Sequence, residues 1–115
     1  RILISLGDGI RSRSSVDIAE SVARKMGGMV SCSRTLVEKG WLPRSRQVGI
    51  SGRTVSPDLY IAFGISGTAQ HRAGMMGAKR IIAVNKDQDA PIHTIADLSL
   101  LADAEEVLKA LDRSL

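Results

Sequence analysis

The 115-residue sequence contains one cysteine, two histidines and three aromatic residues, and each low count excludes a class of protein. A single cysteine cannot form an internal disulfide, and two histidines beside it leave no plausible zinc site. One Trp, one Tyr and one Phe are too few to stack the bases of a single strand, so we expect no nucleic-acid partner. No apolar run approaches the ~20 residues that a membrane-spanning helix needs.

The residues that are present are typical of a single globular domain. Apolar residues make up 43% and charged residues 24%, and 16 Lys and Arg against 12 Asp and Glu give a net charge of +4. The densest basic clusters, Arg11/Arg13 and Arg44/Arg46, are each interrupted by a serine. They are compatible with a solvated surface or with binding of a polyanion such as a cofactor pyrophosphate.

Short apolar runs alternate with amphipathic segments along the whole chain. Strands are predicted at 2–4, 29–32, 48–50, 59–65, 81–84 and 92–95. Helices are predicted from Ser14, as N-cap, to the Gly27-Gly28 pair, at 33–39, at 68–76 and after Asp103 as N-cap. This alternation predicts one α/β domain over residues 1–115, three-layered and Rossmann-like, with a mostly parallel sheet of about six strands.

Ligands of open parallel sheets bind outside the carboxyl ends of the strands. Small or polar residues follow four predicted strands, at 7–9, 33–34, 64–67 and 85–87. The most informative is Gly64-Ile65-Ser66-Gly67, because glycine lets a ligand approach the backbone and the next helix would offer free N–H groups to an anion. The same four residues are equally compatible with a tight turn that binds nothing.

The sequence gives little support for nucleophilic hydrolysis or for a dinucleotide fingerprint. A nucleophile elbow needs glycine where Thr68 stands, and His71 follows Ser66 too closely within one predicted helix to act as its base. Gly7-Asp8-Gly9 lacks the third glycine of a dinucleotide fingerprint, and Asp8 would repel a pyrophosphate. We therefore predict no catalytic residue and no metal ligand, and favour a binding domain whose ligand carries the reactivity.

Two longer segments resemble a known family. LYIAFGISGTAQHRAG at 59–74 and IIAVNKDQDAPI at 81–92 resemble the FAD-binding signature of the electron transfer flavoprotein alpha subunit. Residues 33–41, 47–57 and 96–97 support the match, which runs in order over nearly the whole chain. The resemblance implies FAD as cofactor and the NAD/FAD-binding fold that is also described as deoxyhypusine-synthase-like.

The resemblance also implies a set of cofactor-binding residues. In this set Ser66 and its backbone hold the pyrophosphate, His71 hydrogen-bonds the flavin pyrimidine edge as a donor or cation, and Arg34 lies against the isoalloxazine. Ser51 would lie near the reactive flavin nitrogen and Asp97 toward the adenosine. The full set is Ser33, Arg34, Ser51, Gly52, Gly64, Ser66, Gly67, Gln70, His71, Asn85, Lys86 and Asp97.

Two departures from the family pattern weaken such a site. Ile50 stands where the family usually has glutamine, and Asp8 stands where it usually has arginine. They motivate an alternative, in which a stand-alone relative binds another adenine nucleotide, or has lost FAD binding, and has no redox role.

The leading hypothesis is an electron carrier rather than a substrate-converting enzyme. By resemblance it takes electrons from flavin dehydrogenases, as in fatty acid beta-oxidation, and works with an electron transfer flavoprotein beta subunit; a stand-alone relative could form a homo-oligomer. The alpha subunit's N-terminal domain is expected to be absent. The expected location is the prokaryotic cytoplasm or, in a eukaryote, the mitochondrial matrix, with the cytoplasm favoured.

Overall fold

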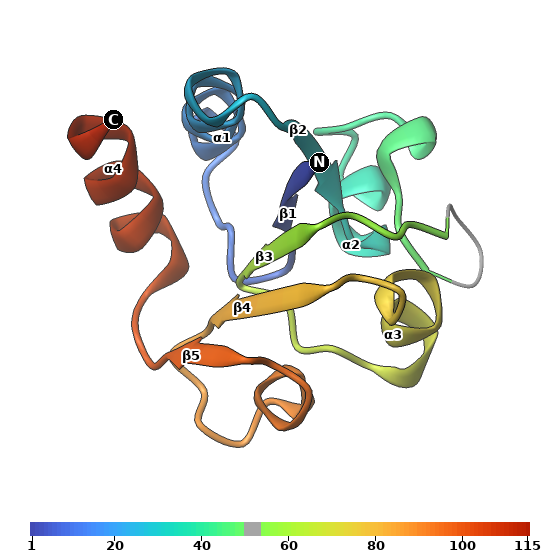
Figure 1. The fold of residues 1–115 in the computed structure, drawn as a ribbon. Coiled ribbons are helices and arrows are strands. Elements are labelled where there is room, and N and C mark those ends of the chain that lie inside the picture. The colour runs from blue at the N-terminus through green and yellow to red at the C-terminus, as the bar shows by residue number, and fades with distance from the viewer. Residues whose placement is uncertain (50–53) are drawn as a thin grey trace.

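The structure, a computed structural model, describes residues 1–49 and 54–115. In these residues one parallel sheet has the strand order β2-β1-β3-β4-β5 (Figure 1). The strands are β1 (Ile2–Leu6), β2 (Met29–Cys32), β3 (Leu59–Phe63), β4 (Arg80–Val84) and β5 (Leu98–Leu100). The helices are α1 (Ser14–Met26), α2 (Arg34–Glu38), α3 (Ala69–Met75) and α4 (Ala104–Ser114), with 3-10 turns at Arg44–Arg46 and Pro91–Thr94.

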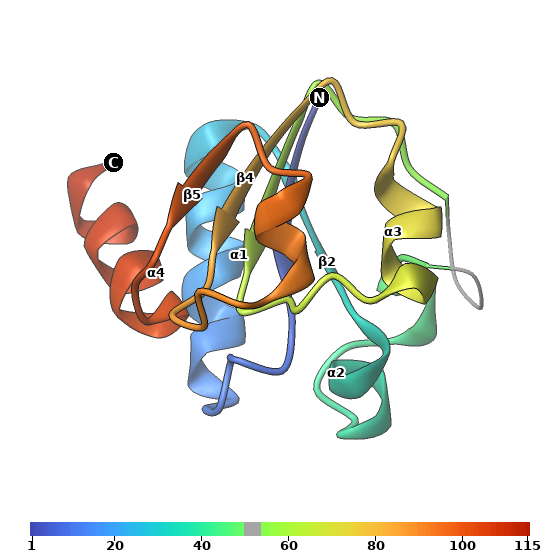
Figure 2. The same ribbon diagram turned by 90° about the horizontal axis from the view of Figure 1, so that it is seen from below.

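The elements form three layers. Figure 2 shows α1 and α4 on one side of the sheet, and α3 and the Pro91–Thr94 turn on the other. The α/β class, the parallel sheet and the three-layer arrangement predicted from the sequence are therefore confirmed. None of the described helices is long and apolar enough to cross a membrane.

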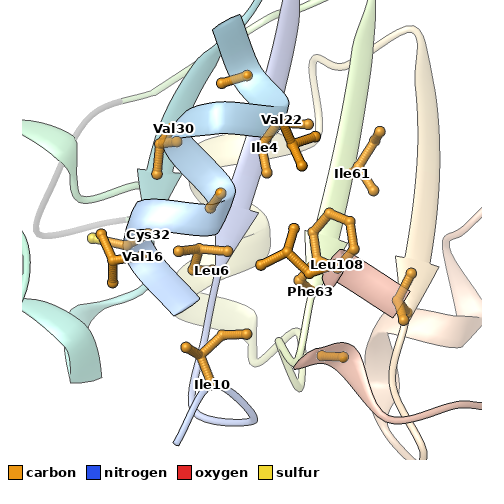
Figure 3. Close-up of a cluster of buried hydrophobic side chains, with 14 of the residues drawn as sticks. Ile4, Leu6, Ile10, Val16, Val22, Val30, Cys32, Ile61, Phe63 and Leu108 are labelled. Carbon is orange, nitrogen blue, oxygen red and sulfur yellow. The ribbon is translucent and has the colours of Figure 1, made fainter. Parts of the chain in front are cut away.

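Alternate residues of the central strands bury their side chains in two separate cores. Ile4 and Phe63 face α1 and α4 in one core (Figure 3), and neither is more than 1% exposed. Leu3 and Tyr60 face the other core, where Met75 of α3 packs. Both sheet faces are thus covered, which explains why these strands are continuously apolar in sequence. Burying each large side chain contributes about 1.5–3 kcal/mol to folding.

Within the described residues, one predicted strand is wrong, one is reduced to bridge pairing and one observed strand was not predicted. Residues 92–95 form part of a 3-10 turn, because Pro91 opens it and the Ile92 N–H donates to the Ser66 carbonyl (2.7 Å) instead of to a strand. At the predicted 48–50 strand, the only pairing described is an isolated bridge between Gln47 and Cys32; Ile50 lies outside the described residues. The edge strand β5 was not predicted, since all three of its residues are exposed.

Of the two predicted N-cap residues, one caps its helix and the other does not. Asp103 caps α4 as predicted, accepting the Glu106 N–H at 3.0 Å. Ser14 lies inside α1, after Arg13 as N-cap residue. Instead, the Glu105 carboxylate of α4 accepts the Ser12 N–H (3.1 Å) and the Ser15 hydroxyl (2.5 Å), placing a negative charge at the positive end of α1.

Gly67 illustrates why the turn after β3 requires glycine. Its φ of 81° lies in the left-handed region, and a Cβ there would sit 2.8 Å from Cα, Cβ and N of Ile92. Gly40 has a similar φ of 75°, but a Cβ there would meet nothing within 4 Å.

We expect Gly67→Ala to lower the free energy of unfolding by about 2–4 kcal/mol, because it combines backbone strain with a clash. Gly40→Ala is the matched control and should cost only about 1 kcal/mol, since it adds the strain alone. Urea titrations of the two variants measure the difference. Equal losses in both would show that the Ile92 contact does not constrain residue 67.

Candidate functional site

The candidate site lies at the point where the strand order of the sheet reverses. β1 is followed in the chain by β2 on one side of it and then by β3 on the other, so the connections after β1 and β3 diverge onto opposite faces. Such a switch point leaves a crevice at the carboxyl edge of the sheet. A cavity of about 210 Å³ opens at this place.

The cavity brings together five of the predicted cofactor-binding residues. Its lining contains Ser33 and Arg34 after β2, Ser66 and Gly67 after β3, and His71 on α3. Their convergence follows from the parallel sheet, in which all strand ends that precede a crossover share one edge. Thr35, Gln47, Val48 and Thr68 also line it; the segments at 33–41, 47–57 and 59–74 that carry the resemblance contain them, but the predicted set of site residues did not.

The remaining predicted residues are not in this lining. Asn85 is at the same sheet edge, but its Nδ2 donates to the Ile65 carbonyl (3.0 Å), and neighbouring Lys86 is exposed. Asp97 precedes β5 at the opposite, amino edge, where its Oδ2 accepts the Ile81 N–H (2.7 Å). The structure therefore does not bring Asp97 together with the others. Ser51, Gly52 and the side chain of Gln70 lie outside what the structure describes.

The glycines of the 64–67 turn contact the protein's own chain. A Cβ on Gly64 would lie 2.7 Å from the Cα of Gly9, and the Gly9 N–H donates to the Gly64 carbonyl at 2.9 Å. From the sequence we expected that these glycines let a ligand approach the backbone closely. In the structure, close packing of two strand ends already requires Gly64, as contact with Ile92 requires Gly67.

Two ion pairs set the charge of the rim. Arg34 pairs with Glu38 one turn along α2 (3.2 Å), with 63% of the arginine side chain exposed. Across the cavity, the Asp8 side chain is 78% exposed and its Oδ1 lies 4.0 Å from Lys39 Nζ. Exposed pairs of this kind contribute about 0–1 kcal/mol, so both side chains are free to exchange partners with a ligand.

A short helix follows the 64–67 turn. α3 has seven residues, and the Thr68 cap residue makes no side-chain cap hydrogen bond. The Ser66 side chain is exposed at the cavity and its carbonyl accepts the Ile92 N–H. Because the helix has only two turns, the anion-binding expectation depends on the Ser66 hydroxyl and the local backbone more than on a helix dipole.

Among the described residues that line the cavity, His71 alone has a side chain that is both buried and titratable. It is 6% exposed, its Nε2 lies 2.6 Å from the Tyr60 hydroxyl, and its Nδ1 has no hydrogen-bond partner among the described residues. Burial lowers the pKa of His71 from 6.5 to about 4, although the nearby Val48 carbonyl acts in the opposite direction. The ring is therefore neutral at pH 7.

This buried neutral histidine makes stability depend on pH. Below pH 6.5 the unfolded chain binds a proton at His71 that the folded chain does not bind until about pH 4. The free energy of unfolding should therefore fall by about 3 kcal/mol as the pH drops from 6.5 to 4. Denaturant titrations across this range measure the fall, which His71→Gln should remove and His93→Gln should retain. A fall of equal size in the His71 variant would contradict the assignment.

The chain is similar over nearly its whole length to three curated relatives. It is 44% identical over 114 residues to "Electron transfer flavoprotein subunit alpha, mitochondrial" of Oryza sativa subsp. indica, covering 99% of this chain and 32% of the relative. It is 46% identical over 110 residues to "Electron transfer flavoprotein subunit alpha" of Mycobacterium leprae, covering 96% and 35%. It is 44% identical over 110 residues to "Protein FixB" of Rhizobium meliloti, covering 96% and 31%. The chain thus spans about a third of the length of these relatives.

A family model gives the same result. The family described as "Electron transfer flavoprotein FAD-binding domain" matches residues 1–76, which include β1 to β3, the cavity and α3. The resemblance seen in the sequence and the prediction of FAD as cofactor are confirmed by this match. The chain belongs to the family of electron transfer flavoprotein FAD-binding domains.

Proposed function

We propose that the domain binds FAD at the switch-point cavity and carries electrons within an electron transfer flavoprotein, from flavin dehydrogenases to a downstream acceptor. The observation that carries the proposal is His71, which lines the cavity of an FAD-binding family member and whose buried Nδ1 has no partner among the described residues. A bound flavin supplies the redox chemistry. The protein's own residues bind it, orient it and exclude water.

The residues of the cavity fit this cofactor. A buried polar atom without a partner costs about 1–3 kcal/mol, so a ligand that reaches His71 Nδ1 relieves that cost. Ser66 offers an exposed hydroxyl, while the Ser33 hydroxyl is shared with Thr35 at 3.0 Å. Arg34 supplies a cation at the rim. An anionic, partly aromatic ligand can use each of these groups.

Apolar walls complete the cavity. Ile65 is 2% and Val48 3% exposed, and both line it. Their side chains and the backbone around them keep water from part of the cavity. Hydrogen bonds are stronger where water is excluded, so the buried His71 acts on a ligand more strongly here than it would on an open surface, whereas Arg34 stays exposed at the rim.

Asp8 supports the alternative function. Its carboxylate lines the cavity, and Lys39 at 4.0 Å offsets its charge only in part. A ligand with fewer phosphate charges, such as another adenine nucleotide, would be repelled less. A domain of this kind would keep the fold and lose the redox role.

The partners and the location are proposed from the relatives. Relatives named as alpha subunits favour a beta subunit as the partner, with flavin dehydrogenases as electron donors, including those of fatty acid oxidation. One relative is named as mitochondrial and others come from bacteria. We therefore place the protein in the prokaryotic cytoplasm or, in a eukaryote, the mitochondrial matrix.

Titration of the purified chain with FAD tests the function. We expect flavin absorbance to remain with the protein after gel filtration and Tm to rise, with about 2.7 kcal/mol of stabilisation at 100 times the Kd. AMP and NAD are titrated in parallel. A rise with AMP or NAD and none with FAD would favour the alternative, and a protein that responds to none of the three would contradict both functions.

Asp8→Asn should tighten FAD binding about three- to fivefold, because it removes a negative charge from the cavity wall. Asp58→Asn is the control for the same change in net charge, since Asp58 pairs with Lys79 just before β3, at the amino edge. Calorimetric Kd values at low and high salt measure the effect, which should shrink as salt rises. Equal gains from both variants would show that only net charge matters.

A further inference from the structure

Three buried polar side chains form a hydrogen-bonded chain that ends at the cavity. Ser5 of β1 and Tyr60 of β3 are 0% exposed, and His71 of α3 is 6% exposed. The Tyr60 hydroxyl donates to Ser5 Oγ at 2.7 Å and lies 2.6 Å from His71 Nε2. The three residues come from three elements and pass across the core on the α3 side of the sheet.

The position of one proton follows from this arrangement. A tyrosine hydroxyl has a single proton, and burial raises the pKa of Tyr60, so the hydroxyl keeps that proton at neutral pH. Because Tyr60 gives the proton to Ser5, its oxygen can only accept from His71. The ring nitrogen that faces Tyr60, Nε2, must then carry the hydrogen.

We infer that Ser5 and Tyr60 set the tautomer of His71, so that the neutral ring, which lines the cavity, keeps a lone pair on Nδ1. Tyr60 is a positioning residue, and Ser5 acts through Tyr60. Nδ1 has no hydrogen-bond partner among the described residues, and the nearby Val48 carbonyl, which acts to raise the pKa of His71, is the group that would favour the other tautomer. The neighbour that the ring does bond selects its tautomer.

This tautomer changes what His71 offers to a ligand. The family resemblance implies a donor or a cation at this position, whereas the neutral ring in the structure offers an acceptor. A ligand N–H can bond Nδ1 directly. A ligand carbonyl can do so only after Nδ1 has taken up a proton, which negative charge on the ligand would favour. This consequence rests on the proposed FAD binding, but the tautomer does not.

The tautomer can be measured without cofactor. Long-range 1H–15N NMR of the labelled chain at pH 7 distinguishes protonated from unprotonated ring nitrogens, and His93→Gln assigns the signals because the sequence has only two histidines. We expect His71 to carry its proton on Nε2. In Ser5→Ala, Tyr60 loses its acceptor and donates to Nε2 instead, so the proton should move to Nδ1. In Tyr60→Phe, the signals should lie between those of the two tautomers.

Ser31→Ala is the matched control. Ser31 is the partner of Ser5 in the β1–β2 register, is 5% exposed, and has a hydroxyl without a hydrogen bond in the described residues. Its removal should leave the His71 signals unchanged. A protonated Nδ1 in the unmodified chain would overturn the inference, whatever the variants do. An unchanged tautomer in folded Ser5→Ala or Tyr60→Phe would overturn the role of that residue.

Failure of the proposed function has a different signature. A chain that never retains FAD but shows the expected Nε2–H signal contradicts cofactor binding and leaves the tautomer established. A chain that retains FAD but carries the His71 proton on Nδ1 supports cofactor binding and contradicts the inferred tautomer. Where Ser5→Ala does not fold, the unmodified chain and Tyr60→Phe still decide between the two tautomers.

Discussion

The cavity depends on the backbone contact between the ends of β1 and β3. The N–H groups of Gly7 and Gly9 donate to the carbonyls of Phe63 and Gly64 at 3.0 and 2.9 Å. A side chain on Gly9 would meet Gly64 Cα at 2.7 Å, so this pairing continues past the strands only because both residues are glycine. Beyond it, one segment turns to α1 and the other to α3, on opposite faces of the sheet. Asp8 of the first segment and residues 65–68 of the second line the cavity, together with residues 33–35 and 47–49. The contact between the two glycines therefore fixes how the first two of these walls lie, without either glycine lining the cavity.

Features with local causes could be predicted from the sequence, and features with distant causes could not. Gly27, with a φ of 73°, ends α1, and Asp103 caps α4, because each acts on its own helix. The carboxylate at the start of α1 comes from Glu105, about 90 residues later in the chain. Nothing near Ser14 indicates it. β5 was missed for a related reason: it is an edge strand with exposed leucines, whose pairing with β4 alone makes it a strand.

The candidate site divides in the same way. Ser33 and Ser66 were found because each follows a buried strand directly, and the parallel sheet brings such positions together. Gln47 and Val48 lie in the 47–57 segment that carries the resemblance but were not in the predicted set, because they reach the cavity from a long connection that is positioned by a bridge to Cys32. Asp97 was grouped with the site by resemblance, yet a residue that precedes a parallel strand lies at the far edge of the sheet. The charge of Asp8 was expected, but its partial compensation by Lys39 depends on the fold.

The bond from Glu105 to the start of α1 has a consequence for how the domain assembles. During synthesis, α1 leaves the ribosome before α4, the helix that holds its capping carboxylate. Until α4 docks, the Ser12 N–H lacks this acceptor and the positive end of α1 faces only water. α1 thus becomes fully stabilised only when α4 is in place, which ties these two helices into one cooperative unit.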